Sequence, residues 1–402
     1  MSHSVESGFL PEVFLSSFKR IRQFQPTELS RHIKRLNFMG PELRWLSQAL
    51  RSHRGRLGQP FKITFAVTYA CQSGCKHCNI WKRKPSGELT VSEIRKIFRS
   101  VPALSWVDLT GGEPFLRPDL EEITEAVLQE CPNLALLHLP TNGLESERIE
   151  RGVHTILAQG PRRLILTVSC DGPPELNVAL RGHPEAWTAS LDTFQRLRSL
   201  RSSRFDVLLG ATLSADNVSE AHRIYSEAKK VIPTLQREDI HWNLAQESPH
   251  YYGNDQQLDP GRNIAQLKKM RQLAGDDEPV GLSPRKIAAH WNPMRAVDRS
   301  YRAHLAAFLD TQRSPVACRS LHSTAFLDPM GVLYPCITWD NPLGNLRENN
   351  YDLRRLWSDD KVSATAKEVR SGNCPQCWTP CEAVPALLGD LPRLVQGSVA
   401  RS

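Results

Sequence analysis

Cysteine is the residue type that most constrains the chemistry of this 402-residue chain, which contains ten of them. Three lie close together at positions 71–78, in the sequence Cys71-Gln-Ser-Gly-Cys75-Lys-His-Cys78. Thiolates at this density suit zinc or an iron–sulfur cluster. Three thiolates leave one position of the metal centre without a protein ligand, and catalysis at a metal requires such an open position. A zinc knuckle completed by His77 or by a remote residue is the alternative.

A second group of cysteines lies toward the C-terminal end of the chain. Its members are Cys318, Cys336, Cys374, Cys377 and Cys381. Apolar residues flank Gly331, between the first two, which predicts a hairpin that turns at this glycine. Two hairpin cysteines and a C-x2-C pair can close a site of four thiolates, with a zinc ribbon as the alternative. We expect Cys131 and Cys170 to be core thiols, because cysteine is among the most buried residue types.

Short apolar runs alternate with helix-like segments over about 180 residues. The predicted strands are 62–67, 106–109, 134–139, 164–169, 205–212 and 240–244. The predicted helices are 91–99, 120–130, 187–200 and 219–230. Strand–helix alternation predicts parallel βα units in an open sheet or a barrel, and six units are fewer than the eight of a closed barrel. The first cysteine loop follows the first strand, where folds of this kind place their chemistry.

The organisation of the whole chain follows from these patterns. We expect five segments: a helical N-terminal segment at 1–59, a core at 60–245, a helical linker or cap of unknown role at 246–315, a cysteine-rich domain at 316–385 and a tail at 386–402. The net charge of +8 is small for this length, so charge gives no argument for a nucleic-acid partner.

No stretch reaches the roughly 18 consecutive apolar residues of a membrane-spanning helix. The N-terminal sequence also lacks a basic region ahead of an apolar run, so it does not resemble a secretory signal. We therefore expect a cytoplasmic protein, in which reduced cysteines indicate metal binding or catalysis before disulfides. Residues 9–24 are apolar on one side and basic nearby. They could lie on an anionic membrane surface, or pack on the core as an ordinary helix.

The spacing C-x3-C-x2-C after a first strand resembles the radical S-adenosylmethionine (SAM) superfamily. Further loops match the family's motifs in order: Gly111-Gly112-Glu113-Pro114, Thr141-Asn142-Gly143, Ser169-Cys170-Asp171-Gly172 and Arg181-Gly182. The resemblance covers residues 60–245 and implies an α/β fold, a partial (β/α)6 TIM-like barrel. It also implies that a [4Fe-4S] cluster is held by Cys71, Cys75 and Cys78.

The resemblance assigns roles to the other loops. It implies that Glu113 accepts a hydrogen bond from the methionyl amino group of SAM and that Asn142 lies near the ribose. Ser169 and Arg181 would hold the methionyl carboxylate, and charge-assisted bonds from arginine to carboxylate are strong and directional. His77 would lie beside the adenine. The alternatives are a loop hydroxyl for Ser169, a solvated surface charge for Arg181 and no ligand contact for His77.

The C-terminal cysteines resemble the SPASM and Twitch extensions of radical SAM enzymes. A full SPASM domain has seven cysteines and two clusters, so the five found here imply one auxiliary [4Fe-4S] cluster, as in Twitch. We expect its ligands to be Cys318, Cys336, Cys374 and Cys377. Cys381 is then either a substitute fourth ligand or a nearby free thiol.

The resemblance implies an enzyme that reductively cleaves SAM to a 5′-deoxyadenosyl radical, which abstracts hydrogen from a substrate C–H bond. The auxiliary cluster would aid electron transfer or substrate binding, and flavodoxin or ferredoxin would be the reductant. The substrate is expected to be a ribosomal peptide or a small alcohol or sugar, and a lipid is the alternative. A non-catalytic zinc-binding adaptor with a nucleic-acid face is the hypothesis from a different class.

Overall fold

The computed structural model describes residues 41–255, 293–390 and 393. One sheet organises them, with its strands in the order β6-β5-β4-β3-β2-β1-β7-β8-β9. The first six strands are mutually parallel and follow the chain order. They are β1 (Lys62–Thr68), β2 (Trp106–Gly111), β3 (Leu136–Thr141), β4 (Leu164–Ser169), β5 (Phe205–Leu213) and β6 (Ile240–Leu244).

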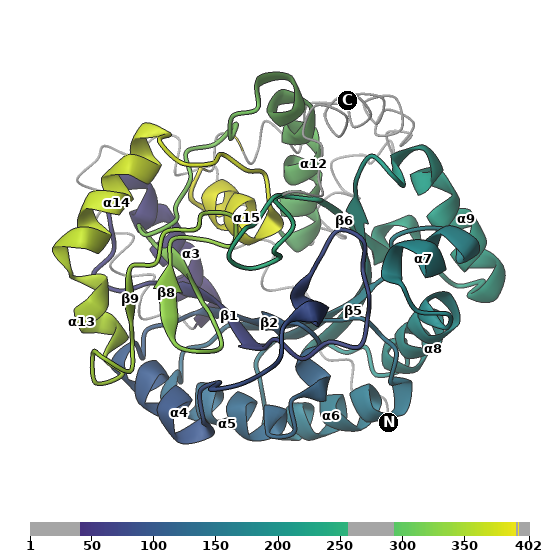
Figure 1. Cartoon of the computed structure of the whole chain (residues 1–402), viewed down its shortest axis with the longest axis horizontal. Helices are drawn as coiled ribbons and strands as arrows, with labels where there is room; N and C mark the ends of the chain where they lie inside the picture. Colours follow the sequence, from purple (N-terminus) through teal and green to yellow (C-terminus); the bar gives the residue numbers. More distant parts are fainter. Residues whose placement is uncertain (1–40, 256–292, 391–392, 394–402) are drawn as a thin grey trace, which may run out of the picture.

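Helices cover one face of these parallel strands. They are α4 (Val91–Ser100), α5 (Leu120–Glu130), α6 (Ser146–Ala158), α7 (Pro174–Arg181), α8 (Ala186–Arg198) and α9 (Ala221–Val231). Short 3-10 turns accompany them: η1 (Ile80–Lys82), η2 (Pro114–Leu116), η3 (Val218–Glu220) and η4 (Arg237–Asp239). Figure 1 shows α4, α5, α6 and α8 in an arc outside the sheet.

The two faces of the sheet differ in burial. Burial alternates along β5, where every second side chain is buried and those between are half-buried. The fully buried side chains, such as Leu166 of β4 and Leu209 of β5, join the core that the outer helices cover. Successive side chains of a strand point to opposite faces. The inner face of these strands is therefore less completely buried than the face that the outer helices cover.

The amino ends of the strands are closed by three other helices: α3 (Pro41–Arg54), α12 (Pro293–Thr311) and α15 (Pro380–Gly389). Their apolar side chains form a second core with Trp106 and Leu136 at the start of β2 and β3. The rings of Tyr301 and Trp378 stack there at 5.5 Å. Within the described residues, this end of the sheet is therefore filled by apolar side chains.

The C-terminal region extends the same sheet. Strand β7 (Thr324–Leu327) pairs in parallel with β1, and β8 (Val332–Tyr334) and β9 (Gly344–Asn345) follow in antiparallel fashion. The hairpin predicted around Gly331 is present, and this glycine has the left-handed φ of 90° that such a turn favours. Helices α13 (Leu353–Trp357) and α14 (Asp360–Ser371) come next and lie beyond α4 in Figure 1.

The six predicted strands are all found. Those at 164–169 and 240–244 have the predicted bounds, and the third begins and ends two residues later than predicted. Helices α6 and α7 were not predicted, although α7 ends at the candidate site residue Arg181. The prediction for residues 9–24 lies outside the described residues, as does the part of the expected linker at 256–292.

Candidate active site

The cysteine loop, residues 71–78, follows the end of β1. Cys75 is buried, and Cys71 and Cys78 are partly buried. Burial raises the pKa of Cys71 to about 11 and that of Cys78 to about 12, and the charges of the neighbouring cysteines add to this effect. Thiolates here therefore need cations beside them, a charge that bound iron would supply. In its donor types and electrostatics the loop fits an iron–sulfur cluster.

The end of α7 holds one side of the cysteine loop. The hydroxyl of Ser73 donates to the carbonyl oxygen of Arg181 at 3.2 Å. The backbone N–H of Lys76 donates to the carbonyl oxygen of Leu180 at 2.9 Å. Because both acceptors are carbonyls in the last turn of α7, the position of this helix determines the position of the loop.

The segment after β6, residues 246–254, holds the other side of the cysteine loop, and we name it the bridge loop. Asn254 donates from Nδ2 to the carbonyl oxygen of His77 at 2.8 Å. The N–H of Asn79 donates to the carbonyl oxygen of Tyr252 at 2.7 Å. No motif in the sequence pointed to this segment, because its contacts depend on backbone groups.

The loop at 111–114 brings a buried carboxylate to the cysteine loop. The N–H of Glu113 donates to the carbonyl oxygen of Ala70 at 2.7 Å. Its carboxylate accepts from the N–H of Asn142 at 2.6 Å and from the hydroxyl of Thr141 at 2.9 Å. Burial raises the pKa of Glu113 to about 7, against the opposing effect of these bonds. Loops after β1, β2 and β3 therefore converge.

Gln72 is a site residue that the sequence did not reveal. Its Oε1 accepts from Nδ2 of Asn142 at 3.0 Å. Its Nε2 is buried and has no hydrogen-bond partner within the described residues. A buried donor without an acceptor is costly unless a ligand satisfies it. This orphaned donor, beside the residues expected to bind SAM, fits a cofactor at this position.

Arg181 is buried and pairs with a carboxylate that the sequence did not single out as a partner. Its Nη1 lies 3.0 Å from Oδ2 of Asp171. Oδ1 of Asp171 accepts from the N–H of Thr212 at 2.7 Å. Both residues are almost inaccessible, at 8% and 1% exposed. Arg181 is thus an anchored, buried cation rather than a solvated surface charge.

Ser169 and His77 lie at the edges of this group. Ser169 is the last residue of β4 and is half-buried. Within the described part of the chain, its hydroxyl makes no hydrogen bond to Arg181. Burial lowers the pKa of His77, while the charges of Asp171 and Arg181 act on it in opposite directions. The imidazole of His77 therefore lies close enough to Asp171 and Arg181 for both charges to affect its protonation.

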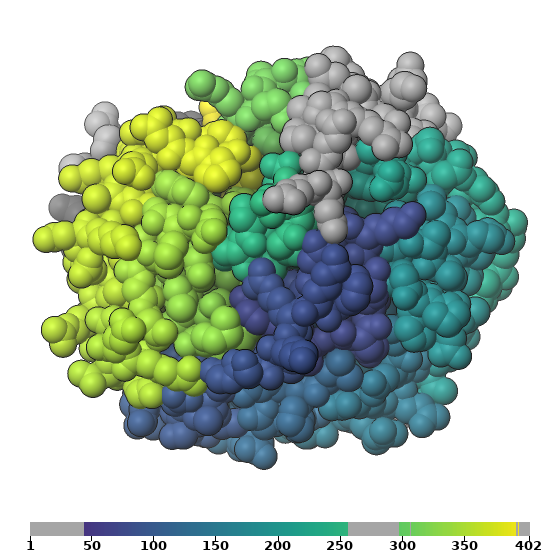
Figure 2. Space-filling view, in the orientation of Figure 1, coloured from purple at the N-terminus to yellow at the C-terminus, as the bar shows by residue number. Residues whose placement is uncertain are grey.

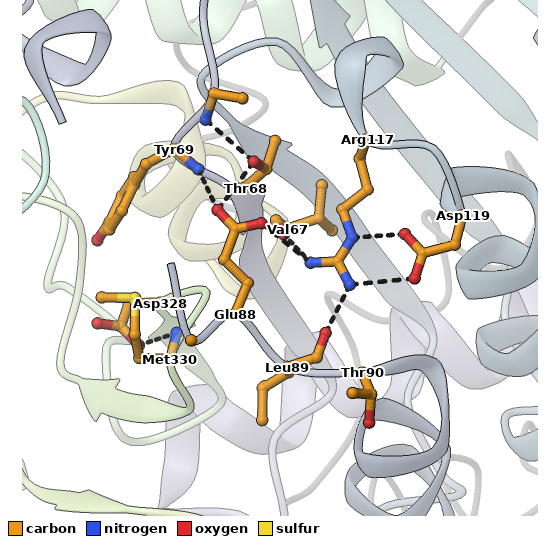
Figure 3. Close-up of polar contacts among 12 residues, drawn as sticks. Val67, Thr68, Tyr69, Glu88, Leu89, Thr90, Arg117, Asp119, Asp328 and Met330 are labelled. Carbon is orange, nitrogen blue, oxygen red and sulfur yellow. Dashed lines mark hydrogen bonds and ion pairs between the residues drawn. The ribbon is translucent and has the colours of Figure 1, made fainter. Parts of the chain in front are cut away.

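A carboxylate also fixes the end of β1, just before the cysteine loop (Figure 3). Oε1 of Glu88 accepts from the hydroxyl of Thr68 at 2.9 Å and from the N–H of Tyr69 at 2.8 Å. Arg117 lies beside Glu88 and donates from Nη1 to the carbonyl oxygen of Val67 at 2.6 Å. The chain thus leaves β1 in a fixed direction.

The second group of cysteines lines a small pocket, partly open to solvent, with about 20 Å³ of water-accessible space. Its cysteines are Cys318, Cys336, Cys374 and Cys377. Burial raises the pKa of Cys377 to about 11 and holds that of Cys336 well above its usual range. Cys381 is not among the lining residues, and its carbonyl oxygen instead accepts from Nζ of Lys62 at 2.6 Å. These four lining residues are the cysteines expected to be ligands, but among the described residues no three Cys, His, Asp or Glu side chains are arranged to hold a metal ion.

The inner face of the sheet carries a buried polar network below the cysteine loop. Nζ of Lys62 lies 2.9 Å from Oδ2 of Asp108, and neither side chain is exposed to a significant extent. Oδ1 of Asp108 lies 3.3 Å from Nδ1 of His138. Nε2 of His138 lies 2.9 Å from the hydroxyl of Thr167. The His138 side chain remains 27% exposed, unlike the nearly inaccessible side chains of Lys62 and Asp108.

Comparison with known proteins identifies the class to which this fold and site belong. The family described as the radical SAM superfamily matches residues 65–218. An AdoMet-dependent heme synthase of Methanosarcina barkeri is 31% identical over 364 residues, which are 79% of this chain and 88% of the relative. The chain therefore belongs to the radical SAM superfamily and is an enzyme of that family. The family implies a [4Fe-4S] cluster and SAM as cofactors.

Shorter and more distant similarities agree. The mycofactocin maturase MftC of Mycobacterium tuberculosis is 30% identical over 186 residues, 44% of each chain. Among solved structures, anSMEcpe with bound AdoMet has a TM-score of 0.53 at 14% identity, covering 84% of this chain and 99% of that one. SuiB of Streptococcus suis bound to S-adenosylmethionine has a TM-score of 0.52 at 15% identity, covering 81% and 71%. These structures share the fold.

Within residues 41–255, 293–390 and 393, no helix combines the length and the apolar character that crossing a bilayer requires.

Proposed function

We propose that this enzyme binds SAM and a [4Fe-4S] cluster at the convergence of its first loops. The cluster ligands would be Cys71, Cys75 and Cys78, and the SAM contacts would be His77, Gly111, Gly112, Glu113, Pro114, Asn142, Ser169 and Arg181. The observation that carries the proposal is the direct bonding between these loops. Glu113 bonds to Ala70 beside the first cysteine, and Ser73 bonds to Arg181.

The chain's own groups would bind and orient SAM. Glu113 presents a buried carboxylate that can accept from an amino group, and Arg181 presents a buried cation that can face a carboxylate. Gln72 offers its free Nε2 donor to a ligand oxygen. Bound together, the cluster and SAM supply a 5′-deoxyadenosyl radical that takes hydrogen from a C–H bond. Closure of the strands' amino ends excludes water from that side.

We further propose one auxiliary [4Fe-4S] cluster in the C-terminal cavity, as in a Twitch domain, which would aid electron transfer or substrate binding. Support comes from the four lining thiols, Cys318, Cys336, Cys374 and Cys377. The position of Cys381 outside that lining favours a free thiol over a substitute ligand. We propose residues 316–385 as the bounds of this auxiliary domain and residues 60–245 as the bounds of the core.

The substrate proposed is a peptide or a small metabolite held against the inner face of the parallel strands. The partly exposed imidazole of His138 supports a polar substrate. MftC is a mycofactocin maturase, and anSMEcpe has been solved with AdoMet and a Kp18Cys peptide. The relative from Methanosarcina barkeri is a heme synthase, which adds a haem-type substrate to the compounds to be assayed. A cytoplasmic location and a flavodoxin or ferredoxin reductant belong to the same proposal.

Anaerobic reconstitution tests both cluster assignments. We expect a brown protein with about eight irons and about eight sulfides per chain, and 5′-deoxyadenosine after addition of SAM and dithionite. Cys71→Ala should abolish nucleoside formation. Cys374→Ser with Cys377→Ser should leave about four irons and the capacity to cleave SAM. A colourless protein containing only zinc would instead support the adaptor hypothesis and reject this function.

A further inference from the structure

The bridge loop (residues 246–254) links the cysteine loop to the loop that would bind the amino group of SAM. Tyr251, at its centre, is only 3% exposed. Its hydroxyl accepts from the N–H of Gly111 at 3.1 Å. The hydroxyl proton can reach the carbonyl oxygen of Gly111 at 3.0 Å or Oγ1 of Thr110 at 3.1 Å. One phenol thus binds both backbone polar groups of Gly111.

The backbone at Gly111 has little room to move, because it lies against the end of β1. Its φ is 133°, and a Cβ there would lie 2.2 Å from the carbonyl oxygen of Thr68. The chain therefore passes very close to the end of β1. The next residue, Gly112, donates its N–H to the same oxygen at 2.8 Å. A group that fixes Gly111 consequently fixes the start of the loop that carries Glu113.

The other end of the bridge loop is attached to the cysteine loop. Asn254 bonds to the carbonyl oxygen of His77 at 2.8 Å, and Asn79 bonds to that of Gly253 at 2.6 Å. Asn254 also closes the bridge loop itself, because its Oδ1 accepts from the N–H of Ser248 at 2.8 Å. The bridge loop therefore sets the separation between the cysteine loop and the 111–114 loop.

We propose that Tyr251 is a positioning residue for SAM, acting through its hydroxyl on Gly111 and thereby on Glu113. This inference rests on the proposed SAM site and adds the residue that aligns its two halves. The hydroxyl of Tyr251 makes the hydrogen bonds to Gly111, and the aromatic ring alone cannot make them. Its ring packs against Phe326 at 4.9 Å, so removal of the hydroxyl alone leaves the packing in place.

The test compares reconstituted wild-type enzyme with Tyr251→Phe, which retains the ring and removes the hydroxyl. We expect the dissociation constant for SAM to rise about tenfold, the size of effect that losing one or two net hydrogen bonds produces. We expect iron content to stay close to that of the wild type and the melting temperature to fall by only a few degrees, because Gly111 loses its bonds to the phenol while the ring stays packed. The change that SAM causes in the electron paramagnetic resonance spectrum of the reduced cluster should also weaken, a response that a structural role alone would not affect.

Tyr334→Phe is the matched control, since this tyrosine belongs to the same aromatic group and its hydroxyl makes no hydrogen bond within the described residues. Its affinity for SAM should equal that of the wild type. The inference is overturned if Tyr251→Phe binds SAM normally, or if it loses iron and thermal stability together with affinity. Failure of the wild type to bind SAM would instead reject the proposed function.

Discussion

Two glycines meet where the cysteine loop approaches the end of α7. Gly182 caps this helix with a left-handed φ of 63°. A Cβ at this position would lie 2.4 Å from the carbonyl oxygen of Gly74. The close approach of the loop to α7 is therefore possible only without a side chain at position 182.

We predict that Gly182→Ala displaces the cysteine loop, so that less iron is bound and most SAM-dependent formation of 5′-deoxyadenosine is lost. Gly160→Ala is the matched control, since Gly160 also has a positive φ (79°), but a Cβ there would meet no other described part of the chain within 4 Å. It should cost about 1–2 kcal/mol of backbone strain without loss of iron. Iron analysis and nucleoside assays compare the two, and equal iron contents would contradict the steric explanation.

Among the elements, Arg117 joins three segments near the cysteine loop (Figure 3). It donates to the carbonyl oxygen of Val67 at 2.6 Å and to that of Leu89 at 2.5 Å. Its Nε lies 2.7 Å from Oδ1 of Asp119, just before α5. The planar guanidinium serves all these acceptors at once, which a lysine ammonium cannot do in the same geometry.

Arg117→Lys should therefore lower the free energy of unfolding by about 2 kcal/mol, because charge-assisted bonds to buried carbonyls are lost. Arg99→Lys is the control, since that guanidinium is 65% exposed beside Glu130 and should contribute below about 1 kcal/mol. Anaerobic urea unfolding measures both variants. Similar losses of unfolding free energy in the two variants would show that the buried guanidinium of Arg117 adds no stability beyond that of an exposed one.

The bridge loop also packs on the β7–β8 hairpin through His250. Its ring stacks on Tyr334 at 4.3 Å and meets the edge of Phe326 at 5.6 Å. Burial lowers the pKa of His250 to about 4. The unfolded chain, with a histidine pKa near 6.5, takes up a proton before the folded protein does. Its contribution to stability is full above about pH 6.5 and is lost as the pH falls toward 4.

We predict that His250→Phe, which keeps an aromatic ring and removes the titration, reduces the acid sensitivity of the fold. Between pH 7 and pH 5 the wild type should lose about 1 kcal/mol more stability than the variant, a value reduced for the partial exposure of the imidazole. Melting temperatures at a series of pH values provide the measurement. Parallel curves for both proteins would contradict the assignment.

At the scale of the whole molecule, the C-terminal cysteine region shares the sheet of the core. Residues Thr324–Leu327 of β7 pair with Lys62–Phe65 of β1, the strand that leads into the cysteine loop. The N–H of Leu89 also donates to the carbonyl oxygen of Pro329 at 2.7 Å. Figure 2 shows the yellow-green C-terminal residues and the dark blue segment after β1 side by side on one face. The two cysteine groups thus belong to one continuous framework.

Removal of residues 316–402 should consequently expose the edge of β1, and an unpaired edge strand promotes aggregation. We expect the shortened chain to sediment or to elute in the void volume of a size-exclusion column. The full-length double variant of Cys374 and Cys377 to serine is the control, because it keeps β7 and should remain monodisperse. A shortened chain that stays monodisperse and binds about four irons would show that the core does not need this edge pairing.

The sequence by itself determined the parallel strands and the positions of both cysteine groups. An apolar run such as 164–169 indicates a buried strand. The short spacing of Cys71, Cys75 and Cys78 limits how far apart their thiols can lie. Helices α6 and α7 escaped prediction, and α7 is short and begins at a Pro-Pro pair.

Only the tertiary structure decided which groups face one another across the site. It paired Arg181 with Asp171, left Nε2 of Gln72 without a partner among the described residues, and placed the bridge loop between the loops after β1 and β2. It also separated Cys381 from the cavity of the other four thiols. These contacts join residues that are far apart in the chain. They depend on packing and on backbone hydrogen bonds, which local sequence patterns do not reveal.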